Sequence, residues 1–221
     1  MKKLISILCA GAMLLSLAAC GSTSGGASAA DTNITADSVV SSDKAGSTNT
    51  GSTVTDADIA AQLADAVTLT FSDSGITADG SGGFETDGTA LTITDAGTYV
   101  LTGSCADGSV KVKKGVTGVT LVLSGLELTS ADTAPITCAK SSQVVLYAAA
   151  GTENRLADTA QNNDETYSEN ADAENAVIKC KDGSQVTLCG SGSLVIEANG
   201  KNGIKSGATT AEEGEASLTI R

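Results

Sequence analysis

One eleven-residue pattern occurs twice in this chain, 42 residues apart. It reads I-x-C-x-x-x-S-Q-V-x-L, and it runs from Ile136 to Leu146 and again from Ile178 to Leu188. In both copies apolar residues alternate with other residues, which is typical of a β-strand with one buried face. A strand pattern that returns at a fixed spacing indicates that equivalent residues of neighbouring repeats stack on one another.

The repeat continues in both directions with a unit of 26 residues, and about 16 inserted residues account for the longer interval between the two copies. The first strand of each unit predicts one column of Val110, Ile136, Ile178 and Ile204 and another of Val112, Cys138, Cys180 and Ser206. A second strand aligns Val119, Val144, Val186 and Leu218, and a third aligns Leu126 and Leu128 with Leu194 and Ile196, with Leu156 between them.

These columns predict the fold class. From Val67 to Arg221 short alternating strands are separated by Gly, Asp, Asn and Ser, which indicates an all-β domain. Two or three strands per unit without a helix favour a parallel β-helix, a solenoid of coils of about 26 residues. An antiparallel β-sandwich is the rival architecture, and it would not explain a period that is kept over four units.

The first 66 residues are not expected to form a core. Residues 1–19 are predicted to be an export leader, because Lys2 and Lys3 precede an apolar run that small residues follow. The stretch "LAAC" that ends at Cys20 resembles the bacterial lipobox, which implies cleavage before Cys20 and a lipid on its sulfur, whereas a plain secretory signal is the alternative. Residues 20–66 are predicted to be a flexible tether with a short helix near its end, capped by Thr55 or Asp56.

The composition excludes several classes of function. The chain has no histidine, which excludes Ser-His-Asp and Cys-His catalysis and most zinc and iron sites. The leader contains two lysines and no acid, so its removal leaves 11 basic residues against 26 acidic ones. A protein with a net charge of −15 is not a general nucleic-acid binder.

Lysines cluster on one predicted ridge. The residues between the two apolar columns point outward, and these are Lys111, Thr137, Lys179 and Lys205. Two positions on come Lys113 and Lys181, and one step further come Lys114 and Lys140. We interpret Lys111, Lys113, Lys179, Lys181 and Lys205 as candidate ligand-binding residues. Ordinary solvated lysines are the alternative.

The inserted segment, residues 157–175, is rich in acids and contains no basic residue. Carboxylate oxygens at this density suit calcium, which takes six to eight oxygen ligands. Asp164, Glu165, Asp172 and Glu174 are the candidate metal ligands, and a solvated acidic loop is the alternative reading.

Four cysteines follow the leader and the lipobox: Cys105, Cys138, Cys180 and Cys189. An even number in an exported protein suggests disulfides. Stacked parallel neighbours such as Cys138 and Cys180 point the same way, which fits the disulfide dihedral poorly. Free, buried thiols are therefore favoured.

The order of the phrases "ITDAGTYVLTG", "DGSVKV", "VTLVLSGLELTSADTAPI", "GTENRL" and "NGIKS" resembles the bacterial β-helical carbohydrate-binding domain family over residues 67–221. The resemblance implies a right-handed parallel β-helix, bound calcium, attachment to the cell surface as a lipoprotein, and binding of plant cell-wall polysaccharides such as cellulose-like glucans and acidic pectin. The chain departs from the family in its four cysteines and in its end at "SLTIR", where relatives continue with further coils. We read that end as the end of a fragment, so that C-terminal coils are missing.

The predicted function is non-catalytic binding of a polysaccharide at the bacterial cell surface. Neutral glycans are usually held on aromatic platforms, and two Phe and three Tyr offer little such surface, so an acidic polymer fits the lysine ridge better. A calcium-dependent polysaccharide lyase and a structural scaffold or adhesin remain the alternatives.

Overall fold

The computed structural model describes residues 54–221, which form one compact unit, while Cys20 and the leader lie outside these residues. Two short helices come first, α1 (Asp56–Gln62) and η1 (Leu63–Asp65). The strands in chain order are β1 (Val67–Ser72), β2 (Gly75–Ala78), β3 (Phe84–Asp87), β4 (Ala90–Ile93), β5 (Gly97–Cys105), β6 (Ser109–Val112), β7 (Val119–Ser130), β8 (Ile136–Cys138), β9 (Gln143–Ala148), β10 (Glu153–Asp158), β11 (Ala176–Cys180), β12 (Gln185–Gly190), β13 (Ser193–Glu197), β14 (Asn202–Lys205) and β15 (Ser217–Ile220).

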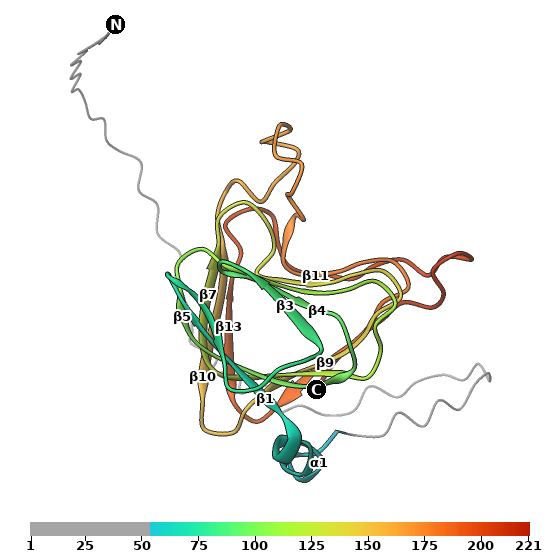
Figure 1. Cartoon of the computed structure of the whole chain (residues 1–221). Coiled ribbons are helices and arrows are strands. Elements are labelled where there is room, and N and C mark those ends of the chain that lie inside the picture. The colour runs from blue at the N-terminus through green and yellow to red at the C-terminus, as the bar shows by residue number, and fades with distance from the viewer. Residues whose placement is uncertain (1–53) are drawn as a thin grey trace, which may run out of the picture. The chain divides into compact units, whose positions relative to one another are not determined.

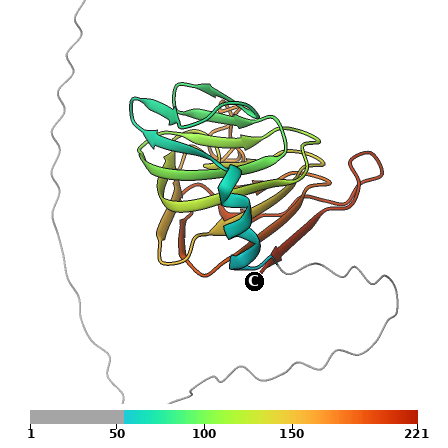
Figure 2. The same ribbon diagram turned by 60° about the horizontal axis from the view of Figure 1, so that its bottom comes forward.

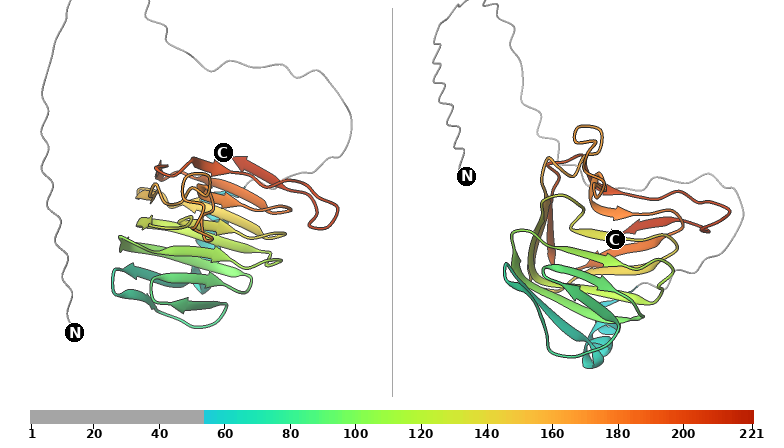
Figure 3. Two further views of the ribbon diagram at one scale, coloured as in Figure 1. Left: turned by 90° about the horizontal axis from the view of Figure 1, so that it is seen from above. Right: turned by 45° about the horizontal axis from the view of Figure 1, so that its top comes forward.

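The strands form two sheets. A nine-stranded sheet has the order β15-β12-β9-β7-β5-β1-β2, with β10 paired to β7 and β13 paired to β10. A six-stranded sheet has the order β14-β11-β8-β6-β4-β3. Figure 1 looks along the stack of strands, and Figure 3 shows the strands layered on one another from the early to the late part of the chain.

The prediction of a right-handed parallel β-helix is wrong. The structure has two mixed sheets that are mostly parallel and do not close on one another. At the early end of the stack, β1 pairs with β2 and β3 pairs with β4 in antiparallel hairpins. The 26-residue spacing begins only at β6, so it could not describe these first strands. A sequence period predicts which residues stack, but it does not predict whether the strands close.

The stacking itself follows the predicted columns. Ile178 lies between Ile136 and Ile204, and Val110 pairs with Ile136. The second strand pairs Val144 with Val119 and Val186, and Val186 with Leu218. In the third, Leu156 pairs with Leu128 and Ile196. Most of these apolar side chains are buried in one core between the sheets, and the late positions Leu194, Ile196, Ile204 and Leu218 are partly buried against it.

The prediction of free cysteines is confirmed. All four described cysteines are free and buried. Cys138 and Cys180 occupy paired positions of β8 and β11 inside the core, so each acts as a small apolar side chain in the column.

The helix α1 begins where it was predicted and packs on the nine-stranded sheet (Figure 2). The Thr55 hydroxyl accepts from the backbone N–H of Asp58, and the Asp58 carboxylate accepts from the Thr55 backbone, which forms a capping box. Ile59 is buried against Val122 and Tyr147. Desolvation, together with a hydrogen bond to Asp56, raises the pKa of Tyr147 to about 12. The end of the predicted tether is therefore part of the folded unit. Among the described residues, no helix is long and apolar enough to span a membrane.

Candidate functional site

A column of lysines crosses the outer face of the six-stranded sheet, as predicted. Lys111 of β6 pairs with Thr137 of β8, Thr137 with Lys179 of β11, and Lys179 with Lys205 of β14. Equivalent residues of in-register parallel strands point the same way and lie about 4.8 Å apart. We call Lys111, Lys179 and Lys205 the lysine column. Lys111 and Lys205 are exposed, and Lys179 is half-buried.

The environment of Lys179 lowers the pKa of its side-chain amine. Desolvation lowers the pKa of Lys179 below the usual value for a lysine, and the positive charge of Lys205 lowers it further. The negative charge of Glu174 acts in the opposite direction but does not cancel these effects. A bound anion would replace the lost solvation and favour the charged amine.

Several other ridge lysines are neutralised by carboxylates. Lys181 lies 2.5 Å from Glu174, measured from Nζ to Oε1. Lys114 and Lys140 lie 2.7 and 3.6 Å from Glu213. Among residues 54–221, no carboxylate lies within salt-bridge distance of the three residues of the lysine column. Lys113 is exposed and points to solvent. The structure therefore leaves the lysine column available for a ligand and gives Lys181 a structural partner.

A groove follows the lysine column. Its lysine end has a volume of about 420 Å³ and is lined by Lys140, Glu174, Lys179, Cys180, Lys181, Asp182, Lys205, Ser206, Gly207 and Ala208. A middle hollow of about 310 Å³ adjoins it and is lined by Ser109, Val110, Lys111, Thr133, Ala134, Thr137, Ala171, Asp172, Glu174 and Lys181. Glu174 and Lys181 belong to both, so their ion pair stands at the junction.

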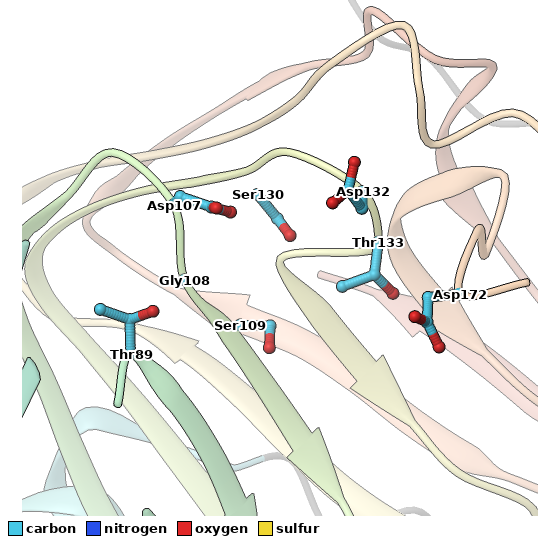
Figure 4. Close-up of a pocket in the computed structure, with 8 residues that line it drawn as sticks. All are labelled: Thr89, Asp107, Gly108, Ser109, Ser130, Asp132, Thr133 and Asp172. Carbon is cyan, nitrogen blue, oxygen red and sulfur yellow. The ribbon is translucent and has the colours of Figure 1, made fainter. Parts of the chain in front are cut away.

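A third hollow continues the groove past the start of β6 and β8. It measures about 250 Å³ and is lined by Thr89, Asp107, Gly108, Ser109, Ser130, Asp132, Thr133 and Asp172 (Figure 4). Ser109, Thr133 and Asp172 are shared with the middle hollow. We call this hollow the hydroxyl end. The sequence does not predict this hollow, because its residues come from separate turns that only the fold brings together.

The acidic insertion forms one wall of the groove and projects from the stack at the top of Figure 1. Asparagines hold it in place. The Asn162 side chain donates to the Asp158 carboxylate and to the Ala176 carbonyl and accepts from the backbone N–H groups of Glu174 and Asn175. The wall is thus anchored at both ends, which keeps Asp172 and Glu174 at the groove.

The predicted calcium ligands do not form a preformed site. Glu174 is paired with Lys181, and Glu165 is paired with Lys201. Asp164 is exposed, and Asp172 faces the groove. Within residues 54–221, no group of three or more Asp, Glu, Cys or His side chains is placed to hold a metal ion. The four candidate ligands are therefore not gathered in this arrangement, and calcium binding by the insertion stays a prediction.

A family model and a curated relative share one description. A model described as "Carbohydrate-binding domain-containing protein" matches residues 87–217, more than half of the chain. The chain belongs to this carbohydrate-binding domain family. A protein of the same description from Acetivibrio thermocellus is 31% identical over 137 residues, which are 62% of this chain and 46% of that protein.

A solved structure is also similar to this carbohydrate-binding domain. It is titled as the polysaccharide lyase-like protein from C. thermocellum, in a gadolinium derivative, and it matches with a TM-score of 0.53 and 29% identity. The match covers 62% of this chain and 54% of that chain. The chain thus spans about half the length of each relative.

This carbohydrate-binding domain has no exposed aromatic platform in the part that the structure describes. Phe71, Tyr99 and Tyr147 are buried, and Phe84 and Tyr167 are only half-exposed. Phe84 also contacts Tyr99 edge to face, with ring centroids 6.4 Å apart.

Proposed function

We propose that this carbohydrate-binding domain binds an acidic polysaccharide of the plant cell-wall type in the groove of the six-stranded sheet, without catalysis. The observation that carries the proposal is the lysine column, in which Lys111, Lys179 and Lys205 project from one face at paired positions. The carboxylates of a uronate polymer repeat along an extended chain, and such a chain laid across the strands meets successive lysines. The lack of an exposed aromatic platform favours this ligand over a neutral glucan.

The charge distribution supports the same ligand. The chain as a whole is strongly acidic, with a formal net charge of −13. Because the rest of the protein is mostly negative, the positively charged lysine column restricts the attraction for a polyanion to the outer face of the six-stranded sheet. Because Lys179 is half-buried, its charge is screened less than that of a fully exposed lysine.

The proposal predicts that Lys179→Glu/Lys205→Glu loses affinity for polygalacturonate by roughly tenfold or more, since a hydrogen bond to a charged group contributes about 1.5–3 kcal/mol. Wild-type binding should weaken as salt shortens the Debye length from about 10 Å at 0.1 M to about 3 Å at 1 M. Paired affinity gels at low and high salt measure both effects.

The matched control is Lys114→Glu/Lys201→Glu, which makes the same charge change at two lysines that line none of the three hollows. It should keep most of the affinity. Retained polygalacturonate binding by a folded Lys179→Glu/Lys205→Glu variant would contradict the proposal.

A lyase is the second candidate, and the lowered pKa of Lys179 is the observation that favours it. A lower pKa makes the deprotonated amine easier to form, and in that form it would take the proton on the carbon next to the uronate carboxylate. The electron pair then forms a carbon–carbon double bond, the bond to the leaving sugar oxygen breaks, and that oxygen takes up a proton. The printed title of the similar structure, a polysaccharide lyase-like protein, points in the same direction. Incubation with polygalacturonate distinguishes the candidates, because elimination forms an unsaturated product that absorbs in the ultraviolet.

We also propose that the domain is exported and anchored to the bacterial cell surface by a lipid on Cys20, which lies outside the described residues. Cys20→Ser should then move the protein from the membrane fraction to the medium or leave an unprocessed precursor. Fractionation with an immunoblot measures this, and Ser22→Ala, close to the processing site, is the control. Unchanged membrane association of Cys20→Ser would refute the anchor.

A further inference from the structure

We infer that the groove binds a mixed polysaccharide, with an uncharged sugar unit at the hydroxyl end and a uronate at the lysine end. The inference rests on the proposed function and adds a second subsite to it. It predicts that the preferred ligand is a polymer in which uronates and neutral sugars lie side by side, rather than a uniformly charged one.

The first step is the continuity of the groove. The hydroxyl end and the middle hollow share Ser109, Thr133 and Asp172, and the middle hollow and the lysine end share Glu174 and Lys181. The path runs obliquely from the start of β6 to the end of β14. Crossing from β6 over β8 and β11 to β14 covers three strand spacings, about 14 Å. One extended oligosaccharide can therefore reach both ends.

The second step is the supply of hydrogen-bonding groups at the hydroxyl end. Thr89, Ser109, Ser130 and Thr133 all line this hollow with their hydroxyl groups, and Figure 4 shows the Ser130 side chain pointing into it. Ser130 is 2% exposed. Its hydroxyl is turned toward the open space of the hollow, and no described residue is left with a buried polar side-chain atom that lacks a partner. Ser130 can therefore exchange a hydrogen bond with a sugar hydroxyl that enters the hollow.

The third step is charge. Asp107, Asp132 and Asp172 line the hydroxyl end, and no lysine or arginine does. Carboxylates accept hydrogen bonds from sugar hydroxyls but repel the carboxylate of a uronate. Hydroxyl donors and acceptors beside carboxylates therefore suit an uncharged polyhydroxylated unit.

An ion pair marks the boundary between the hydroxyl end and the lysine end of the groove. The ion pair of Lys181 with Glu174 separates the acidic hydroxyl end from Lys179 and Lys205. The middle hollow holds two lysines and two acids, whereas only acids charge the hydroxyl end and lysines outnumber acids at the lysine end. The sign of the groove therefore changes across the middle hollow. A ligand with a neutral unit and a uronate in one order matches this change, and the reverse order places the uronate against Asp132 and Asp172.

The test uses the full chain and three probes: polygalacturonate, a neutral β-glucan, and a polymer that alternates galacturonate with an uncharged sugar. We expect wild type to bind the alternating polymer at least several-fold more tightly than either uniform polymer. Ser130→Ala should remove most of this preference and leave polygalacturonate affinity unchanged. Asp172→Asn should strengthen polygalacturonate binding, because it removes a repulsive charge from an exposed position. Ser217→Ala, an exposed serine on β15, is the control.

Equal wild-type affinity for the alternating polymer and polygalacturonate would overturn the inference, as would an unchanged preference in both Ser130→Ala and Asp172→Asn. If a calcium chelator abolishes the preference, the hydroxyl end holds a cation and the inference is also overturned. These failures differ from failure of the proposed function, in which Lys179→Glu/Lys205→Glu keeps its affinity for every acidic probe.

Discussion

Ile178→Asp is expected to unfold the domain. Ile178 is fully buried and lies in the column between Ile136 and Ile204, with β8 on one side and β14 on the other. A carboxylate at this position loses its solvation and finds no partner among apolar neighbours. Mutations that bury an unpaired charge commonly cost about 4–5 kcal/mol or more. Because native domains are stable by only about 5–15 kcal/mol, most or all of the stability is lost.

The measurement is thermal and urea unfolding followed by circular dichroism. Lys179→Asp is the matched control, because the neighbouring side chain on β11 points out of the core and should change the melting temperature little. Ile178→Val removes one methylene group and should cost about 0.5–1.5 kcal/mol. A melting temperature of Ile178→Asp close to wild type would show that the column register is not the one described.

The parts of the fold that follow from side-chain period were predictable. Alternation and a 26-residue spacing predicted the pairing of Ile136 with Ile178 and the outward direction of Lys111, Lys179 and Lys205, because one face of each strand must be buried. The Thr55 cap was predictable from its residue type and from the apolar residues that follow.

The hairpins at the early end were missed although one carried a signal. Gly88 is the first residue of the two-residue turn between β3 and β4 and has a φ of +58°, and glycine at this position is typical of a type II′ hairpin turn. The repeat alone suggested a solenoid from Val67 onward, and this local turn chemistry contradicts a purely parallel arrangement.

The candidate site was predictable only in part. The lysine column follows from strand register, but the pairing of Glu174 with Lys181 and of Glu165 with Lys201 depends on how the insertion folds back. No periodicity in residues 157–175 encodes that path. The hydroxyl end is assembled from separate turns, such as those at Thr89, Asp107 and Asp132, and no spacing rule relates them.

Gly103→Ala is expected to destabilise the domain by about 3 kcal/mol or more, through two separate effects. Gly103 has a φ of +91°, a conformation that residues with a Cβ atom rarely adopt. It also lies opposite a β-bulge in β7, since Leu101 and Gly103 of β5 pair with Leu123 and Leu126 of β7, which leaves one extra residue in β7. A Cβ atom there would lie 2.3 Å from the carbonyl oxygen of Phe71, which belongs to the paired strand β1. Because the new Cβ atom would collide with a main-chain atom, no side-chain rotation can remove the overlap. The paired strands β1 and β5 would have to move apart.

Gly82→Ala isolates the first effect, because Gly82 has a φ of +94° and its Cβ atom would meet nothing within 4 Å. Alanine at this position must adopt a positive φ but meets no neighbouring atom, so Gly82→Ala should lower the free energy of unfolding by about 1 kcal/mol or somewhat more. Urea unfolding of the two variants side by side therefore separates strain from collision. Equal losses at both positions would mean that β1 yields easily and that the tight contact between Phe71 and Gly103 contributes little to stability. A clearly larger loss for Gly103→Ala would place the additional cost in the main-chain contact of β1 with β5, the pair by which the first strand joins the parallel stack.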